Sequence, residues 1–290
     1  MTTIKAMTFN LRGSMLEIDG VNYWPHRADL NISVLRRAAP DIIGFQEFQI
    51  GHRDSYAAHL PEYEHVIGHN TIDDSEFGMQ NPIYWRRERF ALRDCGAFYL
   101  SETPERWSVG WDGVFVRSVN WVRLHDTQAG FDLIALNTHL DHLGETARQN
   151  SARLIVGHLQ AFAADLPVIV TGDMNSRVWA VEANGGHIPP ELSEEATPPG
   201  TVHRIFTAYG LRDTFNEAGH AESADTNTFH DFKGEDYPAI GQRIDWVLIG
   251  DGAGHRLQTL DCAIIRDAQP PVYPSDHYPV MATVRVVSSG

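Results

Sequence analysis

The chain has 290 residues, 42% hydrophobic and 21% charged, so it is long enough to bury a large core and too apolar to be intrinsically disordered. It carries 23 Lys and Arg against 38 Asp and Glu, and the net charge of −15 disfavours ordinary nucleic-acid binding. A protein that neutralised its own acidic cluster with divalent cations would be an exception. Because no apolar run is long enough to span a bilayer and Met1–Asn10 lacks signal-peptide features, we expect a cytoplasmic protein without a membrane span.

No repeat of fixed period or heptad pattern occurs, which excludes solenoids and coiled coils, and we expect residues 1–290 to form a single domain. The two cysteines, Cys95 and Cys262, lie in apolar, strand-like stretches without closely spaced partners. We expect both to be inert core residues.

Short apolar runs bordered by a polar residue recur along the chain. Four of them have strand length and end in a polar residue: Ile4–Phe9 before Asn10, Ile42–Gln46 before Glu47, Leu133–Thr138 before His139, and Val168–Gly172 before Asp173. Two later runs have the inverted order: Asp245 precedes Trp246–Ile249, and Asp276 and His277 precede Pro279–Val287. If the later strands run antiparallel to the earlier ones, these polar positions meet at one edge of the sheets.

Helical patterns separate these strands. Pro25–Ala38 has a proline in its first turn, and Glu145–Ala163 carries a stripe formed by Ala147, Ser151, Leu154, His158 and Phe162. Near-continuously apolar strands are covered on both faces, so we predict an α/β fold with sheets sandwiched between helices. The polar, glycine-containing segments Asn184–Gly200 and Glu217–Gln242 are expected to be long loops at the rim of a cleft.

The polar residues at these strand ends are of two chemical kinds. Asn10, Glu47, Asp173 and Asn175 offer hard oxygen donors, which suit Mg²⁺ or Mn²⁺. His139 and His277 could act on a phosphoester, since its hydrolysis needs a group that orients or deprotonates water. Asp245 is a candidate to bind the ring of His277 and fix its tautomer.

In this combination the sequence resembles the endonuclease/exonuclease/phosphatase superfamily of metal-dependent phosphoesterases, which includes DNase I. Six motifs carry the resemblance in the same order: Thr8–Arg12 (TFNLR), Asp41–Glu47 (DIIGFQE), Asn137–His139 (NTH), Gly172–Asn175 (GDMN), Arg243–Asp245 (RID) and Ser275–His277 (SDH). The chain is most similar to small bacterial members whose substrates are mostly unassigned. The resemblance implies a DNase I-like four-layer α/β sandwich, in which helices flank two packed mixed β-sheets.

The resemblance also implies a role for each matching residue. Glu47 would be the main Mg²⁺ (or Mn²⁺) ligand, with Asn10 and Asp276 nearby. Asp173 and Asn175 would position the attacking water and the phosphate. His277, oriented by Asp245, would complete the catalytic pair, and His139 would hydrogen-bond a phosphoryl oxygen.

Two departures limit this transfer. Arg12 stands where some DNA-repair members carry an acidic residue, which puts a second metal site there in doubt, and His139 stands where those members use tyrosine. Lys5 and Lys233 are the only lysines, and no basic insertion suited to gripping a duplex is present, so duplex nucleic acid is not an expected partner.

Five further residues are candidate substrate contacts. Arg148 could bind an anion near the start of its helix, and a solvated helix arginine is an equally good interpretation. The same alternatives hold for Arg27 and Arg86. His142 could contact substrate or belong to an ordinary capping loop, and His230 follows a Thr-Phe pair in a long loop.

We therefore predict a metal-dependent phosphatase or phosphodiesterase that acts on a small phosphorylated molecule by water attack. A nuclease acting on DNA, RNA or short oligonucleotides is the alternative. A dinuclear zinc hydrolase, suggested by His139-x-Asp141-His142, and a non-catalytic phospho-ligand binder are the remaining interpretations.

Overall fold

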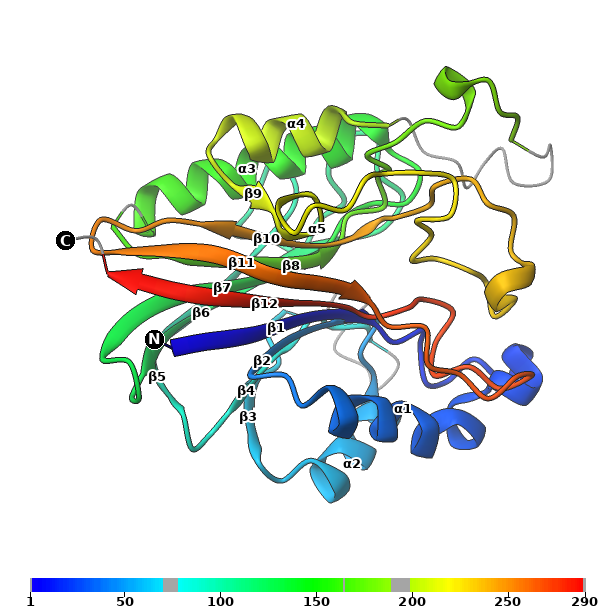
Figure 1. Ribbon diagram of the computed structural model, residues 1–290, viewed down its shortest axis with the longest axis horizontal. Coiled ribbons are helices and arrows are strands. Elements are labelled where there is room, and N and C mark those ends of the chain that lie inside the picture. The colour runs from blue at the N-terminus through cyan, green and yellow to red at the C-terminus, as the bar shows by residue number, and fades with distance from the viewer. Residues whose placement is uncertain (1, 70–77, 164, 189–198, 289–290) are drawn as a thin grey trace.

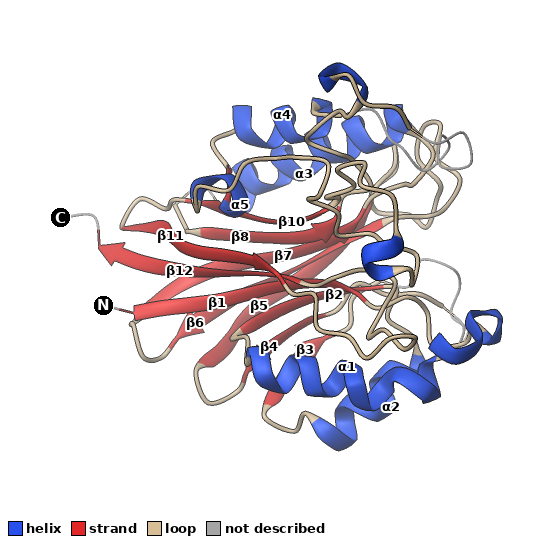
Figure 2. Cartoon of the chain, turned by 45° about the vertical axis from the view of Figure 1, so that its right-hand side comes forward, coloured by secondary structure: helices blue, strands red, loops and turns tan. Residues whose placement is uncertain are grey.

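The computed structural model describes residues 2–69, 78–163, 165–188 and 199–288. In this part of the chain the strands form two mixed six-stranded sheets that pack face to face, and helices cover the two outer faces (Figure 1, Figure 2). The first sheet has the order β11-β12-β1-β2-β4-β3 and the second β5-β6-β7-β8-β10-β9. This arrangement confirms the predicted four-layer α/β sandwich.

The first sheet consists of β1 (Thr2–Asn10), β2 (Ile42–Gln46), β3 (Tyr63–Val66), β4 (Ile83–Arg86), β11 (His255–Ile264) and β12 (Val280–Ser288). The second consists of β5 (Phe90–Tyr99), β6 (Ser118–Asp126), β7 (Phe131–His139), β8 (Val168–Asp173), β9 (Arg212–Asp213) and β10 (Asp245–Gly250). Helices α1 (Trp24–Ala38) and α2 (Ile50–His59) cover the first sheet, α3 (Glu145–Phe162) and α4 (Thr201–Ala208) cover the second, and the short α5 (Thr214–Glu217) lies beside β10 and β11 (Figure 1).

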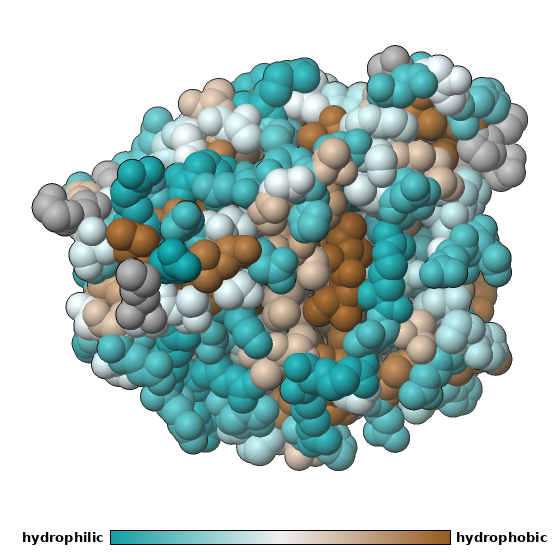
Figure 3. Space-filling view, in the orientation of Figure 1, coloured by the Kyte–Doolittle hydropathy of each residue, from teal (hydrophilic) through white to brown (hydrophobic). Residues whose placement is uncertain are grey.

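Apolar side chains fill the three spaces between the four layers. Residues such as Ile4, Val122 and Val280 form the core between the sheets. Leu136 and Ile155 belong to the core between the second sheet and its helices, and a third core lies between the first sheet and α1 and α2. Because the central strands are buried on both faces, their sequences are apolar nearly throughout, as predicted. The face shown in Figure 3 is mostly hydrophilic, with apolar residues in separate patches.

The strand directions bring the polar strand ends together. β10 runs antiparallel to β8, so Asp245 pairs with Asp173, and β12 runs antiparallel to β1, so Val280 pairs with Thr8. β1 and β2 are parallel, as are β7 and β8. The inverted order of polar residue and strand along the sequence therefore has the predicted structural meaning.

A buried polar network joins the two sheets close to these strand ends. The Gln46 Nε2 donates to Asn137 Oδ1 over 2.7 Å, and Thr171 Oγ1 donates to the same oxygen over 3.1 Å. A Cβ atom on Gly44 would lie only 2.0 Å from Thr171 Oγ1, so only glycine permits this approach of the sheets. The network fixes the relative position of the strands that carry the polar residues.

Some expectations about single residues were wrong. Cys95 is exposed on strand β5, at the edge of the second sheet, whereas Cys262 is buried as predicted. Of the stripe predicted on α3, Ala147 and Ser151 are buried, and Leu154 is only partly buried. Toward the end of the helix the buried positions are Ala152, Ile155 and Leu159. His158 and Phe162 are only partly buried, because they stack on Phe98 and Trp121 at the margin of the helix contact.

One of the two predicted loops falls partly outside the described residues. Positions 189–198 of Asn184–Gly200 are not described, whereas Glu217–Gln242 is irregular after the end of α5, apart from a short 3₁₀ turn. No helix in the described ranges is long and apolar enough to cross a membrane.

Candidate active site

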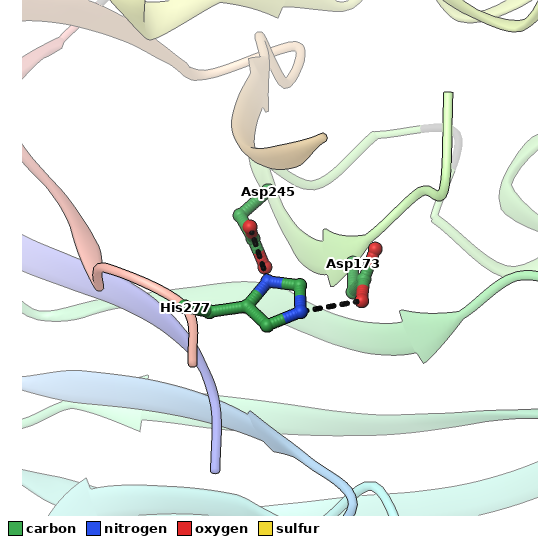
Figure 4. Close-up of side chains that lie close together, drawn as sticks. All are labelled: Asp173, Asp245 and His277. Atoms are coloured by element: carbon green, nitrogen blue, oxygen red, sulfur yellow. Dashed lines mark hydrogen bonds and ion pairs between the residues drawn. The ribbon is translucent and has the colours of Figure 1, made fainter. Parts of the chain in front are cut away.

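His277 lies between two aspartates where β8 ends and β10 begins (Figure 4). Its Nδ1 lies 2.8 Å from Asp245 Oδ2, and its Nε2 lies 3.8 Å from Asp173 Oδ2. Asp245 and Asp173 are a cross-strand pair, so the sheet itself sets the spacing of the two carboxylates. The Nδ1–H donates to Asp245, which fixes the ring orientation and directs Nε2 toward Asp173.

The three groups alter one another's protonation. Burial disfavours the charged imidazolium, but the negative charges of Asp245 and Asp173 outweigh it and raise the pKa of His277 to about 10. Burial and the charge of Asp245 raise the pKa of Asp173 to about 7. A carboxylate in this range can accept a proton near neutral pH, next to a positively charged ring.

Asn10 connects Asp173 to Glu47 across the two sheets. Its Nδ2 donates to Asp173 Oδ2 over 2.9 Å and to Glu47 Oε1 over 3.2 Å, and Gly13 N donates to Glu47 Oε2 over 3.2 Å. Glu47 has a positive φ of 56° and Asn175 one of 45°. Backbone strain of this kind costs about 1–3 kcal/mol and is concentrated at functional sites.

Asp276 adds a further carboxylate beside Glu47. Its Oδ1 accepts a hydrogen bond from Ser275 Oγ, and its Oδ2 lies 3.7 Å from Arg12 Nη1. Burial raises the pKa of Asp276 although His277 and Arg12 oppose the shift, and the charge of Glu47 adds to it. Asn10, Glu47 and Asp276 are hard oxygen donors with an excess of negative charge, which fits a Mg²⁺- or Mn²⁺-sized cation.

His139 and Asn175 complete the surroundings of Asp173. The His139 Nε2 lies 3.4 Å from Asp173 Oδ2, and Asn175 N donates to Asp173 Oδ1 over 2.9 Å. Burial, followed by the positive charges of Arg117 and His277, holds the pKa of His139 well below its usual value. His139 is therefore neutral near pH 7 and can donate one N–H to an oxygen in the cavity.

These side chains surround a cavity of about 600 Å³. The polar and charged residues that line it are Arg12, Glu47, Arg117, His139, His142, Asp173, Asn175, Gln242, Asp276 and His277. Leu16, Met79, Phe115, Val116, Leu143, Phe229 and Ile244 form its apolar walls. Asn10 and Asp245 are not among the lining residues: Asn10 holds Asp173, and Asp245 holds His277, through the hydrogen bonds described above.

None of the three arginines predicted as substrate contacts lines the cavity. Arg27 is fully buried and donates to the carbonyls of Asn22, Arg12 and Pro274. Arg148 pairs with Glu145 and donates to Asp141 O, and Arg86 pairs with Glu62 at the far end of β4. Their guanidinium groups bond to other residues of the fold and do not line the cavity.

The two histidine candidates differ. His142 lines the cavity and stacks on Phe115, with ring centroids 5.5 Å apart. His230 does not line it: the ring is buried against Tyr278, and its Nδ1 accepts a hydrogen bond from Gly234 N. Burial and the nearby charge of His277 lower the pKa of His230 to about 3, so it packs as a neutral ring.

Sequence reasoning missed two arginines of the cavity wall as site residues. Arg12 was noted only as a departure from the motif, yet it bonds Asp19 through two nitrogens and faces Asp276. Arg117 directly precedes β6, which runs antiparallel to β7. A polar residue before an antiparallel strand is the same signal that identified Asp245, and it could have identified Arg117.

Known structures match the chain over nearly its whole length. The endonuclease/exonuclease/phosphatase from Bacteroides vulgatus is 27% identical, with a TM-score of 0.81 and coverage of 99% of this chain and 100% of the other. A mannosyl-6-phosphatase from Bacteroides thetaiotaomicron is 25% identical, with a TM-score of 0.77 and coverage of 98% and 99%. The human nocturnin catalytic domain shares the fold at 16% identity, with a TM-score of 0.69 and coverage of 98% and 95%.

No curated protein matches the sequence at a significant level. A family model does: residues 7–277 match the Endonuclease/Exonuclease/phosphatase family. This range includes all the motifs and every cavity residue discussed above. The chain therefore belongs to the endonuclease/exonuclease/phosphatase family, whose members are phosphoester hydrolases that generally depend on a divalent metal.

Proposed function

We propose that the chain is a Mg²⁺- or Mn²⁺-dependent hydrolase of small phosphorylated substrates, which cleaves the phosphoester by attack of water on phosphorus. One observation carries the proposal: the His277 ring is held between Asp245 and Asp173 at a cavity that Glu47 also lines. A positioned base, two ring donors and a group of hard oxygen ligands are what phosphoester hydrolysis requires.

The residues divide the chemistry among them. Asp173, oriented by Asn10 and by the backbone N–H of Asn175, holds the attacking water and accepts its proton at Oδ2. The 3.8 Å between His277 Nε2 and Asp173 Oδ2 is too long for a hydrogen bond. Nε2 can therefore donate to an oxygen of water or substrate, and Oδ2, which already accepts from Asn10, can accept a second hydrogen bond. His139 and His277 donate N–H groups to phosphoryl oxygens.

Glu47, with Asn10 and Asp276, would hold the metal. When bound, the cation supplies stabilisation of the negative charge that develops on the phosphoryl and leaving-group oxygens. The positive φ of Glu47 directs its carboxylate to this place, and the hydrogen bonds from Asn10 and Gly13 restrict its motion. This preorganisation lowers the entropy cost of binding a cation.

Size and charge favour a small substrate over polymeric nucleic acid. The cavity of about 600 Å³ suits a metabolite, and the net charge of −15 repels a polyanion. The similarity to a mannosyl-6-phosphatase supports sugar phosphates as the class to test first. A short oligonucleotide is the competing substrate and belongs in the same assay.

The zinc-hydrolase interpretation is disfavoured by the bonding of Asp141. Its Oδ1 accepts hydrogen bonds from the backbone N–H groups of Leu143 and Gly144, and its Oδ2 accepts from those of Val114 and Phe115. These bonds use the carboxylate to fix two loops. Asp141 is therefore a poor metal ligand, and the motif His139-x-Asp141-His142 has a structural explanation.

The test is turnover of p-nitrophenyl phosphate, bis(p-nitrophenyl) phosphate, hexose 6-phosphates and a short oligonucleotide, with Mg²⁺ or Mn²⁺ and with EDTA. We expect His277→Ala to lower kcat at least 10²-fold. His125→Ala is the matched control, because His125 forms a similar pair with Asp132, at 2.7 Å, away from the cavity.

Metal-dependent turnover that His277→Ala removes and His125→Ala preserves would support the proposal. Turnover that persists in EDTA and in His277→Ala would refute the assignment of the site. Binding of phosphorylated compounds without turnover of any substrate would identify a phospho-ligand binder instead.

A further inference from the structure

Arg117 occupies a position that the proposed chemistry does not yet use. It lies between the apolar cavity residue Val116 and the first residue of β6, and it lines the same cavity as His139. In the register of β6 and β7, Val119 pairs with Thr138, so Arg117 lies beside the end of β7 that carries His139. The preceding loop is fixed by the hydrogen bonds from Val114 N and Phe115 N to Asp141.

The bonding of Arg117, which is partly buried, differs from that of the fully buried arginines Arg243, Arg148 and Arg27. Arg243 pairs with Asp213 and Glu222, Arg148 pairs with Glu145, and Arg27 donates to four backbone carbonyls. Among the described residues, the Arg117 guanidinium has neither a hydrogen bond nor an ion pair within 4 Å, and its buried Nε has no partner.

An unpaired guanidinium in such a place is costly unless a ligand satisfies it. A buried donor without a partner loses the hydrogen bonds it made to water, and the loss is larger when the donor is charged. The ring of Phe115 lies 5.8 Å from the guanidinium carbon of Arg117 and cannot accept five N–H donors. Glu47, Asp173 and Asp141 attract Arg117 electrostatically but lie beyond ion-pair distance, so the donors remain available to an anion inside the cavity.

We propose that Arg117 binds a non-bridging oxygen of the scissile phosphate group and thereby selects phosphate monoesters over diesters. This inference rests on the proposed function. A monoester presents three non-bridging oxygens and is largely dianionic above pH 6, whereas a diester presents two and carries a single charge. With His139 and His277 donating to two oxygens, Arg117 supplies the donor and the charge for the third. A diester carries its second organic group in place of that oxygen.

Two substrates with one leaving group test the selection: p-nitrophenyl phosphate and methyl p-nitrophenyl phosphate, each assayed with Mn²⁺. We expect Arg117→Met to lower kcat/KM for the monoester by about 10- to 100-fold, the usual effect of losing a hydrogen bond to a charged group. The diester should change less than about threefold. Arg117→Lys should retain part of the monoester activity, because it keeps the charge and loses the planar fork.

Calorimetric titration with inorganic phosphate tests binding without turnover. The affinity of the Mn²⁺-loaded protein for phosphate should fall by a similar factor in Arg117→Met and stay unchanged in Arg123→Met, a variant of a β6 arginine that pairs with Asp132 outside the cavity. The melting temperature of Arg117→Met should not fall, since no ion pair is lost. A purely structural arginine would give the opposite result.

Equal losses on both esters, or unchanged phosphate binding in Arg117→Met, would overturn the inference about Arg117. Failure of the wild-type protein to hydrolyse either ester would instead count against the proposed function, and the phosphate titration would still decide whether Arg117 binds the anion.

Discussion

Two buried charge clusters meet near the start of β10, where one contains Asp245 and the other contains Arg243. Their charges are arranged in opposite ways. In the His277 cluster (Asp173, Asp245 and His277), two carboxylates share one ring, and burial together with Asp245 raises the pKa of Asp173 to about 7. In the Arg243 cluster (Arg243, Asp213 and Glu222), the guanidinium contacts both carboxylates. There Arg243 and His203 outweigh the effect of burial and lower the pKa of Asp213 to about 2.

The difference separates stabilisation from function. Every charge of the Arg243 cluster has an opposite charge beside it. The cluster therefore joins β9, the segment after α5 that carries Glu222, and the residues directly before β10. The His277 cluster keeps excess negative charge beside a cavity, and the contact between His277 and Asp173 is long, at 3.8 Å. Such an arrangement costs stability unless a cation or a substrate completes it. Substituting aspartate by asparagine in each cluster measures this contrast.

The largest expected effect is on activity. Asp245→Asn keeps the size of the side chain but removes the charge that fixes the His277 tautomer, so we expect kcat to fall by about 10²- to 10⁴-fold. The measurement is kcat on an ester that the wild-type protein hydrolyses. Asp132→Asn, in the His125 pair, is the matched control and should stay within twofold of wild type. Activity of Asp245→Asn within threefold of wild type would contradict the role given to this pair.

The next effect is a gain of stability in the metal-free protein. Because the folded-state pKa of Asp173 is raised from 3.8 to about 7, its ionisation opposes folding as pH rises between these values. We expect Asp173→Asn to raise the free energy of unfolding in EDTA by about 2–4 kcal/mol at pH 8, and to have no such effect below about pH 4. Urea denaturation at both pH values measures it. If Asp173→Asn were less stable than wild type at pH 8, the negative charge of Asp173 would be balanced by other groups of the protein even without metal.

The smallest effect has the opposite sign. The folded-state pKa of Asp213 is about 2, below its usual value of 3.8, so its stabilising contribution is complete above about pH 4 and is lost as pH falls toward 2. Asp213→Asn should lower the free energy of unfolding by about 2 kcal/mol at pH 6, with a shrinking difference from wild type below pH 4. Asparagine can still cap α5 through Phe215 N. Asp225→Asn, at an exposed position, is the control. If Asp213→Asn and Asp225→Asn were equally stable at pH 6, the Arg243 cluster would not stabilise the fold and would not differ from the His277 cluster in this way.

The alternation of apolar runs and polar ends determined the fold class and the set of strand-end residues. Continuous apolar runs such as Val168–Gly172 can be buried only in a sheet covered on both faces, and this property is local. The inverted position of Asp245 also indicated an antiparallel partner, because hydrogen-bonded strands of opposite direction place the start of one beside the end of the other. The six motifs were enough to identify the family.

Only the tertiary structure decided which arginines are available to a ligand. Arg27, Arg148 and Arg117 are equivalent as isolated residues, since each can serve as an anion contact or as a structural cation. Arg148 bonds nearby residues, Glu145 and the carbonyl of Asp141, whereas Arg27 bonds Pro274 O, 247 positions away, and Arg117 finds no partner among the described residues. Whether a guanidinium is paired within the fold or left for a ligand depends on distances set by the packed sheets and loops, and the sequence around Arg27 or Arg117 does not contain those distances.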